Sequence, residues 1–197
     1  MLLSTAYLPP VSYFQKIASS QHFQLEKHEH FIKQTYRNRC HIYGANGVQV
    51  LSIPLINTHQ KTPIAEKKIA CKQNWQQQHW RSLESAYRNS PYFIYYENEL
   101  KFFYEEEFEF LLDYNTGLLK LLLKLLKLPA EFSFTDNFEK EAAEDFRNLI
   151  SPKHPAGEKN CLRYTQVFEE KHGFKADLSI VDLLFNKGPE AKEMLAK

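Results

Sequence analysis

Hydrophobic and polar positions alternate in short runs near the start of this chain, and the runs predict strands separated by helices. Residues 2–7 form an apolar run typical of a buried strand, which Leu8-Pro9-Pro10 ends. Proline is tolerated in the first turn of a helix, so we expect a helix over 11–17. A second strand is expected near 23–27.

The clearest hairpin lies next along the chain. Residues 40–43 and 48–53 are two strand-like runs, and Asn46-Gly47 between them supplies the positive φ that a tight reversal needs. Pro54 ends the second arm. One more short strand is expected within 62–71.

Helical periodicity dominates the middle of the chain. A helix is predicted over 75–89, because apolar residues recur there every four positions, and Pro91 stops it. Another helical region runs from about 97 into a leucine-rich stretch, with Asn115 or Thr116 expected to cap or break it. The stripe of the first helix consists of Trp75, His79, Leu83 and Tyr87.

The last third predicts a strand and two more helices. The strand covers 132–135, and a helix is expected to follow it as far as Ile150. The final helix begins near Asp177 or Ser179, and Gly188-Pro189 close it. Strands that alternate with helices predict an α/β fold: a single domain over 1–197, with a partly parallel sheet, an antiparallel hairpin and flanking helices.

Composition narrows the function classes. A net charge of +1 gives no global electrostatic reason to expect nucleic acid as a partner. The three cysteines are widely spaced and form no CxxC pair, which indicates free thiols in a reducing compartment. The start of the chain lacks a signal-peptide pattern, and lysines interrupt the leucine-rich stretch, so a soluble cytoplasmic protein without a transmembrane segment is expected. The cysteines are Cys40, Cys71 and Cys161, and the interrupting lysines are Lys120, Lys124 and Lys127.

Three cations gather just ahead of the predicted hairpin. Lys33, Arg37 and Arg39 lie there with Tyr36 and Asn38, and the two arginines would point the same way on an extended chain. Guanidinium groups hold phosphates and carboxylates in bidentate fashion. We therefore interpret the segment as a substrate-binding site for an anion. The alternative interpretation is a solvated basic loop.

The turn after the first strand is a second candidate. Ligands of α/β sheets bind near the carboxyl ends of strands and the helix N-termini beside them, so Tyr7 is expected to line the site. No Gly-rich loop follows the strand, so no Rossmann or P-loop phosphate cradle is indicated, and the cofactor is unknown. A proline turn packed on the core is the competing interpretation.

Three further polar residues are candidates for chemistry. His79 is the first candidate for proton transfer, because imidazole titrates near neutrality, although a satisfied core or boundary histidine is the favoured interpretation. Asp182 and Asn186 lie four apart on the last helix, as a catalytic carboxylate and a substrate-binding amide. A capping box formed by Ser179 and Asp182 competes with that interpretation. His28-Glu29-His30 lacks a third metal ligand nearby, so no metal site is predicted.

Several short motifs follow one another in a set order along the chain. They are Tyr7-Leu8-Pro9 with Tyr13-Phe14; Lys33 with Asn38-Arg39; Leu51-Ser52-Ile53-Pro54; Trp75, His79 and Pro91-Tyr92-Phe93; Tyr164-Thr165-Gln166-Val167-Phe168; and Leu178-Ser179-Ile180-Val181-Asp182 leading to Gly188-Pro189.

This order of motifs resembles the WbqC-like protein family of bacteria over nearly the whole chain. Its members are similar to proteins encoded with O-antigen and other surface-polysaccharide enzymes, which implies a role around nucleotide-activated or lipid-linked sugars. The resemblance brings no established reaction or catalytic residue. Many members have Gln-Pro where this chain has Thr5-Ala6, so a contact made by that Gln would be missing here.

Two functions follow as hypotheses. The first is a transferase that acts on a phosphorylated or nucleotide-linked sugar, with the cations of 33–39 neutralising phosphate charge. The second is a non-catalytic binding or assembly protein of an envelope pathway, whose Tyr- and Phe-rich surface engages a protein partner.

Overall fold

Two small sheets organise the part of the chain that the computed structural model describes, residues 1–56, 62–70, 74–153 and 161–196. One sheet is parallel with strand order β1-β2-β5, and the other is the antiparallel pair β3-β4. The α/β fold expected from the sequence is confirmed. The strands are β1 (Leu2–Ser4), β2 (His22–Glu26), β3 (Arg39–Gly44), β4 (Gly47–Ser52) and β5 (Glu131–Phe134).

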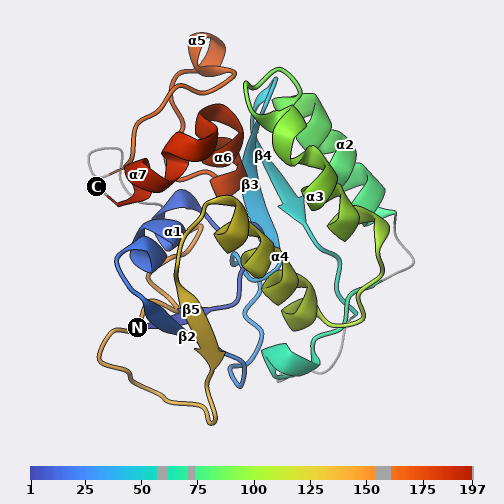
Figure 1. Cartoon of the computed structure of the whole chain (residues 1–197). Helices are drawn as coiled ribbons and strands as arrows, with labels where there is room; N and C mark the ends of the chain where they lie inside the picture. Colours follow the sequence, from blue (N-terminus) through green and yellow to red (C-terminus); the bar gives the residue numbers. More distant parts are fainter. Residues whose placement is uncertain (57–61, 71–73, 154–160, 197) are drawn as a thin grey trace.

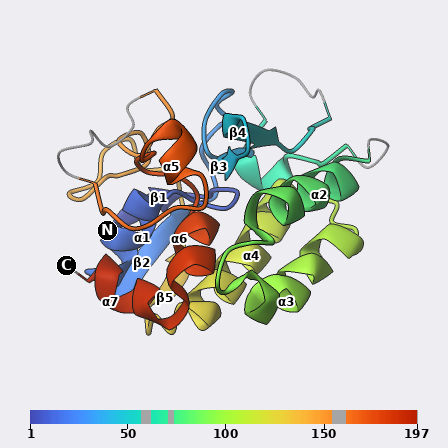
Figure 2. The ribbon, with the colours of Figure 1, turned by 90° about the horizontal axis from the view of Figure 1, so that it is seen from above.

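Helices surround both sheets. Figure 1 shows α1, α6 and α7 on one side of the molecule, α2 and α3 on the other, and α4 between them; Figure 2 shows α2 and α3 side by side. No helix in the described ranges is long and apolar enough to cross a membrane. The helices are α1 (Val11–Ala18), η1 (Ile64–Glu66), α2 (Trp75–Tyr87), α3 (Phe93–Glu105), α4 (Leu111–Leu125), α5 (Glu169–His172), α6 (Ile180–Lys187), η3 (Gly188–Glu190) and α7 (Ala191–Leu195).

The parallel sheet brings three strand ends to one edge. Ser4 pairs with Glu26 in the β1-β2 register, and the backbone N–H of Thr135, just after β5, donates to the carbonyl of Leu25. Because all three strands run the same way, Ser4, Glu26 and Thr135 mark a shared carboxyl edge. Ligands of open α/β sheets bind at such an edge.

The predicted hairpin is confirmed. Arg39 pairs with Ser52 and Gly44 with Gly47, which leaves a two-residue turn, and Gly47 adopts a φ of 105°. That dihedral favours glycine, because a side chain would clash with the backbone there. Residues Cys40 and Ile42 of β3 are fully buried on the inner face of the hairpin.

The helix expected over 136–150 is absent, and the sequence prediction was wrong there. The chain instead forms a parallel bridge between Leu2 and Asp145, with Leu2 N donating to the Glu144 carbonyl (2.8 Å) and Phe146 N to the Leu2 carbonyl (2.9 Å). Pairing with the open edge of β1 satisfies the backbone groups that a helix would otherwise satisfy internally.

The helical region after residue 97 is divided at a different place from the one predicted. Asn115 and Thr116 lie buried inside α4, and the break falls at 106–110. Backbone pairing fixes that break, because Ile69 N donates to the Glu109 carbonyl and Leu111 N to the Lys67 carbonyl. The short strand expected within 62–71 is likewise replaced: the described part, 62–70, contains η1 and isolated bridges instead.

Candidate functional site

A hollow opens at the carboxyl end of β1. It is shallow: the space inside it is about 10 Å³, room for about one water molecule. Residues from the exit of β1, the first turn of α1, the 33–39 segment and the 136–150 segment contribute to it. The lining consists of Ser4, Thr5, Ala6, Tyr13, Tyr36, Arg37, Phe146, Arg147 and Ile150.

Arg37 reaches the hollow as half of a buried ion pair. Its Nε donates to Glu29 Oε1 (2.7 Å), and its Nη2 donates to Glu29 Oε2 (2.5 Å) and Ser4 Oγ (2.7 Å). Both charged side chains are buried, at 3% and 7% exposed. The bidentate geometry holds the guanidinium plane in one orientation beside the exit of β1.

Arg147 forms a second buried network on the other side of Ser4. Its Nη1 donates to Glu26 Oε2 (3.1 Å), its Nη2 pairs with Asp145, and Ser4 Oγ donates to its carbonyl (3.2 Å). The hydrogen bonds from Arg147 hold the pKa of Asp145 below its usual range. Glu26 also accepts from the hydroxyl of Thr135 (2.9 Å), so the ends of β2 and β5 join the network.

Sequence reasoning missed Glu26 and Arg147. Glu26 gave a usable signal, because a charge at the end of an apolar strand marks the carboxyl edge of a sheet. Arg147 gave none, since Glu26, with which it pairs at this edge, lies 121 positions away in the chain.

The structure divides the predicted anion site. Tyr36 and Arg37 line the hollow, whereas Lys33 is exposed and Arg39 is half-buried at the start of β3. Within the described ranges, the buried atoms Arg39 Nε and Asn38 Oδ1 have no hydrogen-bond partner.

Tyr36 links the hollow to the face of β3 that carries Arg39. Its ring meets that of His41 edge-on at 5.5 Å, and Arg39 and His41 lie on the same face of the strand because they are two residues apart. Burial, with the positive charge of Arg39 as a smaller cause, lowers the pKa of His41. Arg39, a cation whose Nε has no partner in the described ranges, is therefore connected to the hollow through His41 and Tyr36.

Tyr7 and His79 contact each other in the core. The Tyr7 hydroxyl bonds to His79 Nδ1 (2.9 Å) and to the Tyr104 hydroxyl (2.9 Å). Burial lowers the pKa of His79 to about 4, against a hydrogen bond that the imidazole donates to the backbone of Ser52, so the imidazole is neutral at pH 7. Neither residue lines the hollow. Proton transfer by His79 stays a prediction.

The backbone is strained where β1 leaves the sheet. Leu8, directly after Tyr7, has a φ of 39°, which is rare for a bulky side chain. Asp177 has a φ of 51° and accepts from the backbone N–H (2.8 Å) and the hydroxyl (2.9 Å) of Ser12 at the start of α1. Strained residues of this kind cluster at functional sites.

Asp182 and Asn186 lie on α6, away from the hollow. Asp182 is fully buried and accepts from the Tyr87 hydroxyl (2.9 Å) and from Gln166 Nε2 (3.3 Å). Burial raises its pKa to about 6, although these partners oppose the shift. The capping box suggested for Ser179 is absent, because its side chain makes no cap hydrogen bond and the Asp182 carboxylate is used elsewhere.

A larger cleft opens at the end of α6. It measures about 1440 Å³ with the open solvent at its mouth, and both Asn186 and Gln166 line it. Asn186 Nδ2 donates to the Asp182 carbonyl (2.8 Å). Asp182 does not line the cleft itself, but it is hydrogen-bonded to Gln166, which does. The catalytic role of Asp182 stays a prediction.

No group of three or more His, Cys, Asp or Glu side chains is placed to hold a metal in the described part of the chain. In the sequence His28-Glu29-His30, the carboxylate of Glu29 is ion-paired with Arg37, and His28 Nε2 bonds to the Thr135 carbonyl (3.1 Å). Cys40 is a free, buried thiol, and Cys71 lies outside the described residues.

Comparisons with known proteins identify relatives of the chain. The model of the WbqC-like protein family matches residues 5–153, which confirms the resemblance found in the motifs, although the match ends before the Leu178 motif. An uncharacterized protein of Mycobacterium tuberculosis is 24% identical over 225 aligned positions, which cover 98% of this chain and 96% of the relative. No solved structure matches the chain.

Proposed function

Because the chain belongs to the WbqC-like protein family, we propose that it is a transferase that acts on a phosphorylated or nucleotide-linked sugar in surface-polysaccharide biosynthesis. One observation carries the proposal. Two buried guanidinium groups, those of Arg37 and Arg147, line a hollow at the edge where three parallel strands end.

A sugar ring would lie over the mouth of the hollow, because the space inside it, about 10 Å³, holds only about one water molecule. Arg37 and Arg147 are already paired with carboxylates. A sugar hydroxyl both donates and accepts hydrogen bonds, so it would accept from a guanidinium group and donate to the paired carboxylate. Thr5 and Tyr36 add polar groups to the same wall.

Arg39 is the proposed phosphate ligand. Its Nε lacks a partner in the described ranges, and the unpaired Oδ1 of Asn38 beside it is an acceptor for a sugar hydroxyl. A phosphate there would lie across Tyr36 from the sugar, with the exposed Lys33 as a more distant cation. Preorganised cations of this kind stabilise the charge that develops in group transfer. Tyr7 would support this wall from the core, and His79 and Asp182 are the proposed proton-transfer candidates.

A ligand screen tests the proposal. The stability of the protein is measured by thermal unfolding with UDP-glucose, glucose 1-phosphate, ATP and inorganic phosphate. A ligand at 100 times its Kd should add about 2.7 kcal/mol of stability. Arg39→Ala should abolish that gain while it changes the unliganded Tm little. Arg88→Ala is the matched control, because Arg88 is an exposed arginine paired with Glu84 one helical turn away.

Two results would contradict the proposal. If none of these anions stabilises the protein, the proposed binding site does not exist. If the Arg39→Ala and Arg88→Ala variants respond equally to the ligand, Arg39 is not part of the site. Cleavage of a bound nucleotide sugar to free nucleotide, with the sugar recovered on an added acceptor alcohol, would establish group transfer, whereas recovery of free sugar would indicate hydrolysis.

A non-catalytic binding protein is the second candidate function. One face of α3 exposes Ile94 (69%), Tyr95 (73%) and Phe102 (53%), an apolar surface of the kind that engages protein partners. Binding of a nucleotide sugar without turnover, combined with self-association on a sizing column, would favour this function.

A further inference from the structure

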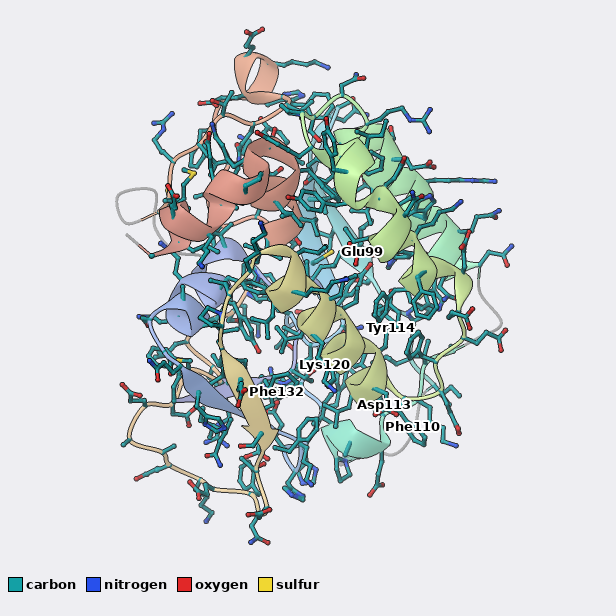
Figure 3. All side chains as sticks on the ribbon, in the orientation of Figure 1. Glu99, Phe110, Asp113, Tyr114, Lys120 and Phe132 are labelled. Atoms are coloured by element: carbon teal, nitrogen blue, oxygen red, sulfur yellow. The ribbon has the colours of Figure 1, made fainter. Side chains whose placement is uncertain are left out.

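A groove runs between α4 and β5, apart from the hollow. It measures about 850 Å³ with its open mouth included. Figure 3 shows Lys120 of α4 next to Phe132 of β5, the two residues that face each other across it. The lining consists of Lys120, Leu123, Ala130, Glu131, Phe132 and Phe134.

The floor of the groove is aromatic, and the strand that forms it, β5, lies at the edge of its sheet. Phe132 pairs with the fully buried Phe23 of β2, and their rings lie 5.6 Å apart. Phe132 and Phe134 are two residues apart, so both rings lie on this face, 6.0 Å from each other. No further strand lies beyond β5 in the described sheet, and both rings are left half-exposed.

Ammonium groups flank this aromatic floor. Lys120 Nζ lies 6.0 Å from the centre of the Phe132 ring, and Lys27 Nζ lies 5.8 Å from that of Phe134. Neither lysine takes part in an ion pair with another described residue. Glu131 is the one carboxylate in the lining, and it forms no ion pair with another described residue. The groove thus joins an apolar floor to a positive rim.

We propose that the groove binds a monomeric single-chain anionic amphiphile, an alkyl chain that ends in a phosphate. The chain would lie along Leu123, Phe132 and Phe134, and the phosphate would contact Lys120 or Lys27. Charge complementarity selects the anionic head, because the lysines of the rim lack an acidic partner. A strand rises about 3.3 Å per residue, so the stretch from Ala130 to Phe134 offers an elongated floor that fits a chain better than a disc-shaped base.

This site does not depend on the proposed sugar site, and its lining shares no residue with that of the hollow. Lys27 follows Glu26 at the end of β2, and its backbone N–H lies 3.4 Å from the hydroxyl of Thr135. A phosphate held by Lys27 would therefore lie beside the carboxyl edge of the sheet.

Isothermal titration with hexyl, octyl and decyl phosphate below their micelle concentrations tests the proposal. Each methylene that leaves water should tighten Kd about fourfold. Decyl maltoside, which has the same chain and a neutral head, should bind at least tenfold more weakly than decyl phosphate. Lys120→Glu should weaken decyl phosphate at least tenfold and leave decyl maltoside unchanged. Lys192→Glu, the same charge change at an exposed position of α7, should alter neither.

Phe132→Ser tests the floor, with Phe102→Ser as the control at an exposed phenylalanine of α3. The Phe132 variant should lose the dependence on chain length, and the control should keep it. Near-ultraviolet circular dichroism checks that both variants are folded.

Four outcomes would overturn the proposal. Equal affinity for the phosphate and the maltoside would show that the lysines do not select the head. Equal effects of the two lysine variants would place the ligand elsewhere. Binding of UMP as tight as that of decyl phosphate would indicate a nucleotide site, and binding to anionic vesicles without binding of the monomer would indicate a membrane surface.

Discussion

Replacement of Arg37 by Met should unfold the protein at much lower urea concentration. The guanidinium group makes two hydrogen bonds to Glu29 and one to Ser4, and it is only 3% exposed. Removal of one partner leaves a buried carboxylate without a counter-charge, which typically costs about 3–5 kcal/mol. That is a large fraction of the roughly 5–15 kcal/mol by which domains are stable.

Urea unfolding followed by tryptophan fluorescence measures this loss, because Trp75 and Trp80 are buried and report on the core. Arg88→Met is the matched control. Glu84, the partner of Arg88, is exposed enough to be solvated after the change. The substitution should therefore lower the free energy of unfolding by less than about 0.5 kcal/mol. If Arg37→Met shifts the unfolding midpoint no more than the control does, the pair at the edge of the sheet is hydrated and the reasoning fails.

Three further predictions concern buried groups elsewhere. Asp182 has a folded pKa of about 6 against an ordinary value of 3.8, so the stability that its neutral form gives at low pH is lost as pH rises through 6. The free energy of unfolding of the wild type, measured by urea titration, should fall relative to that of Asp182→Asn by up to about 3 kcal/mol between about pH 4 and pH 7, and parallel pH profiles of the two proteins would contradict this. Tyr7→Phe should cost about 1–3 kcal/mol, because His79 Nδ1 loses its buried partner; a Tm equal to that of the wild type would show that water replaces the hydroxyl. Gly188→Ala should cost about 2–4 kcal/mol, because residue 188 has a φ of 50° and a Cβ there would lie 2.5 Å from the Tyr92 ring; an unchanged urea midpoint would refute the clash.

Local patterns predicted the elements that local forces form. The hairpin, α1, α2 and the strands of the parallel sheet follow from alternation, helical stripes and proline or glycine stops in the sequence. The segment 136–150 has helical composition, yet its backbone pairs with β1, more than a hundred positions away. Tertiary pairing overrode propensity there, and no window of local sequence contains that information.

The candidate site shows the same division. The sequence drew attention to 33–39 because its cations are neighbours, but Arg37 lies in a turn before β3, so strand alternation does not align it with Arg39. Arg37 enters the interior because Glu29 is there to receive it, and Arg147 does the same with Glu26. Which charge is buried depends on the partner, and partners are assigned by the fold.

The position of these ion pairs is itself an argument for function. Buried ion pairs are costly to desolvate, and replacing both partners with apolar residues of similar size is often neutral or stabilising. Here two such pairs lie side by side where three parallel strands end, which is where ligands of open sheets bind. The double variant Arg37→Met with Glu29→Met separates the two roles. It should recover most of the stability that Arg37→Met alone loses, and it should still lose the stabilisation that sugar phosphates give the wild type. A double variant that keeps the full ligand response would show that the pair serves only the fold.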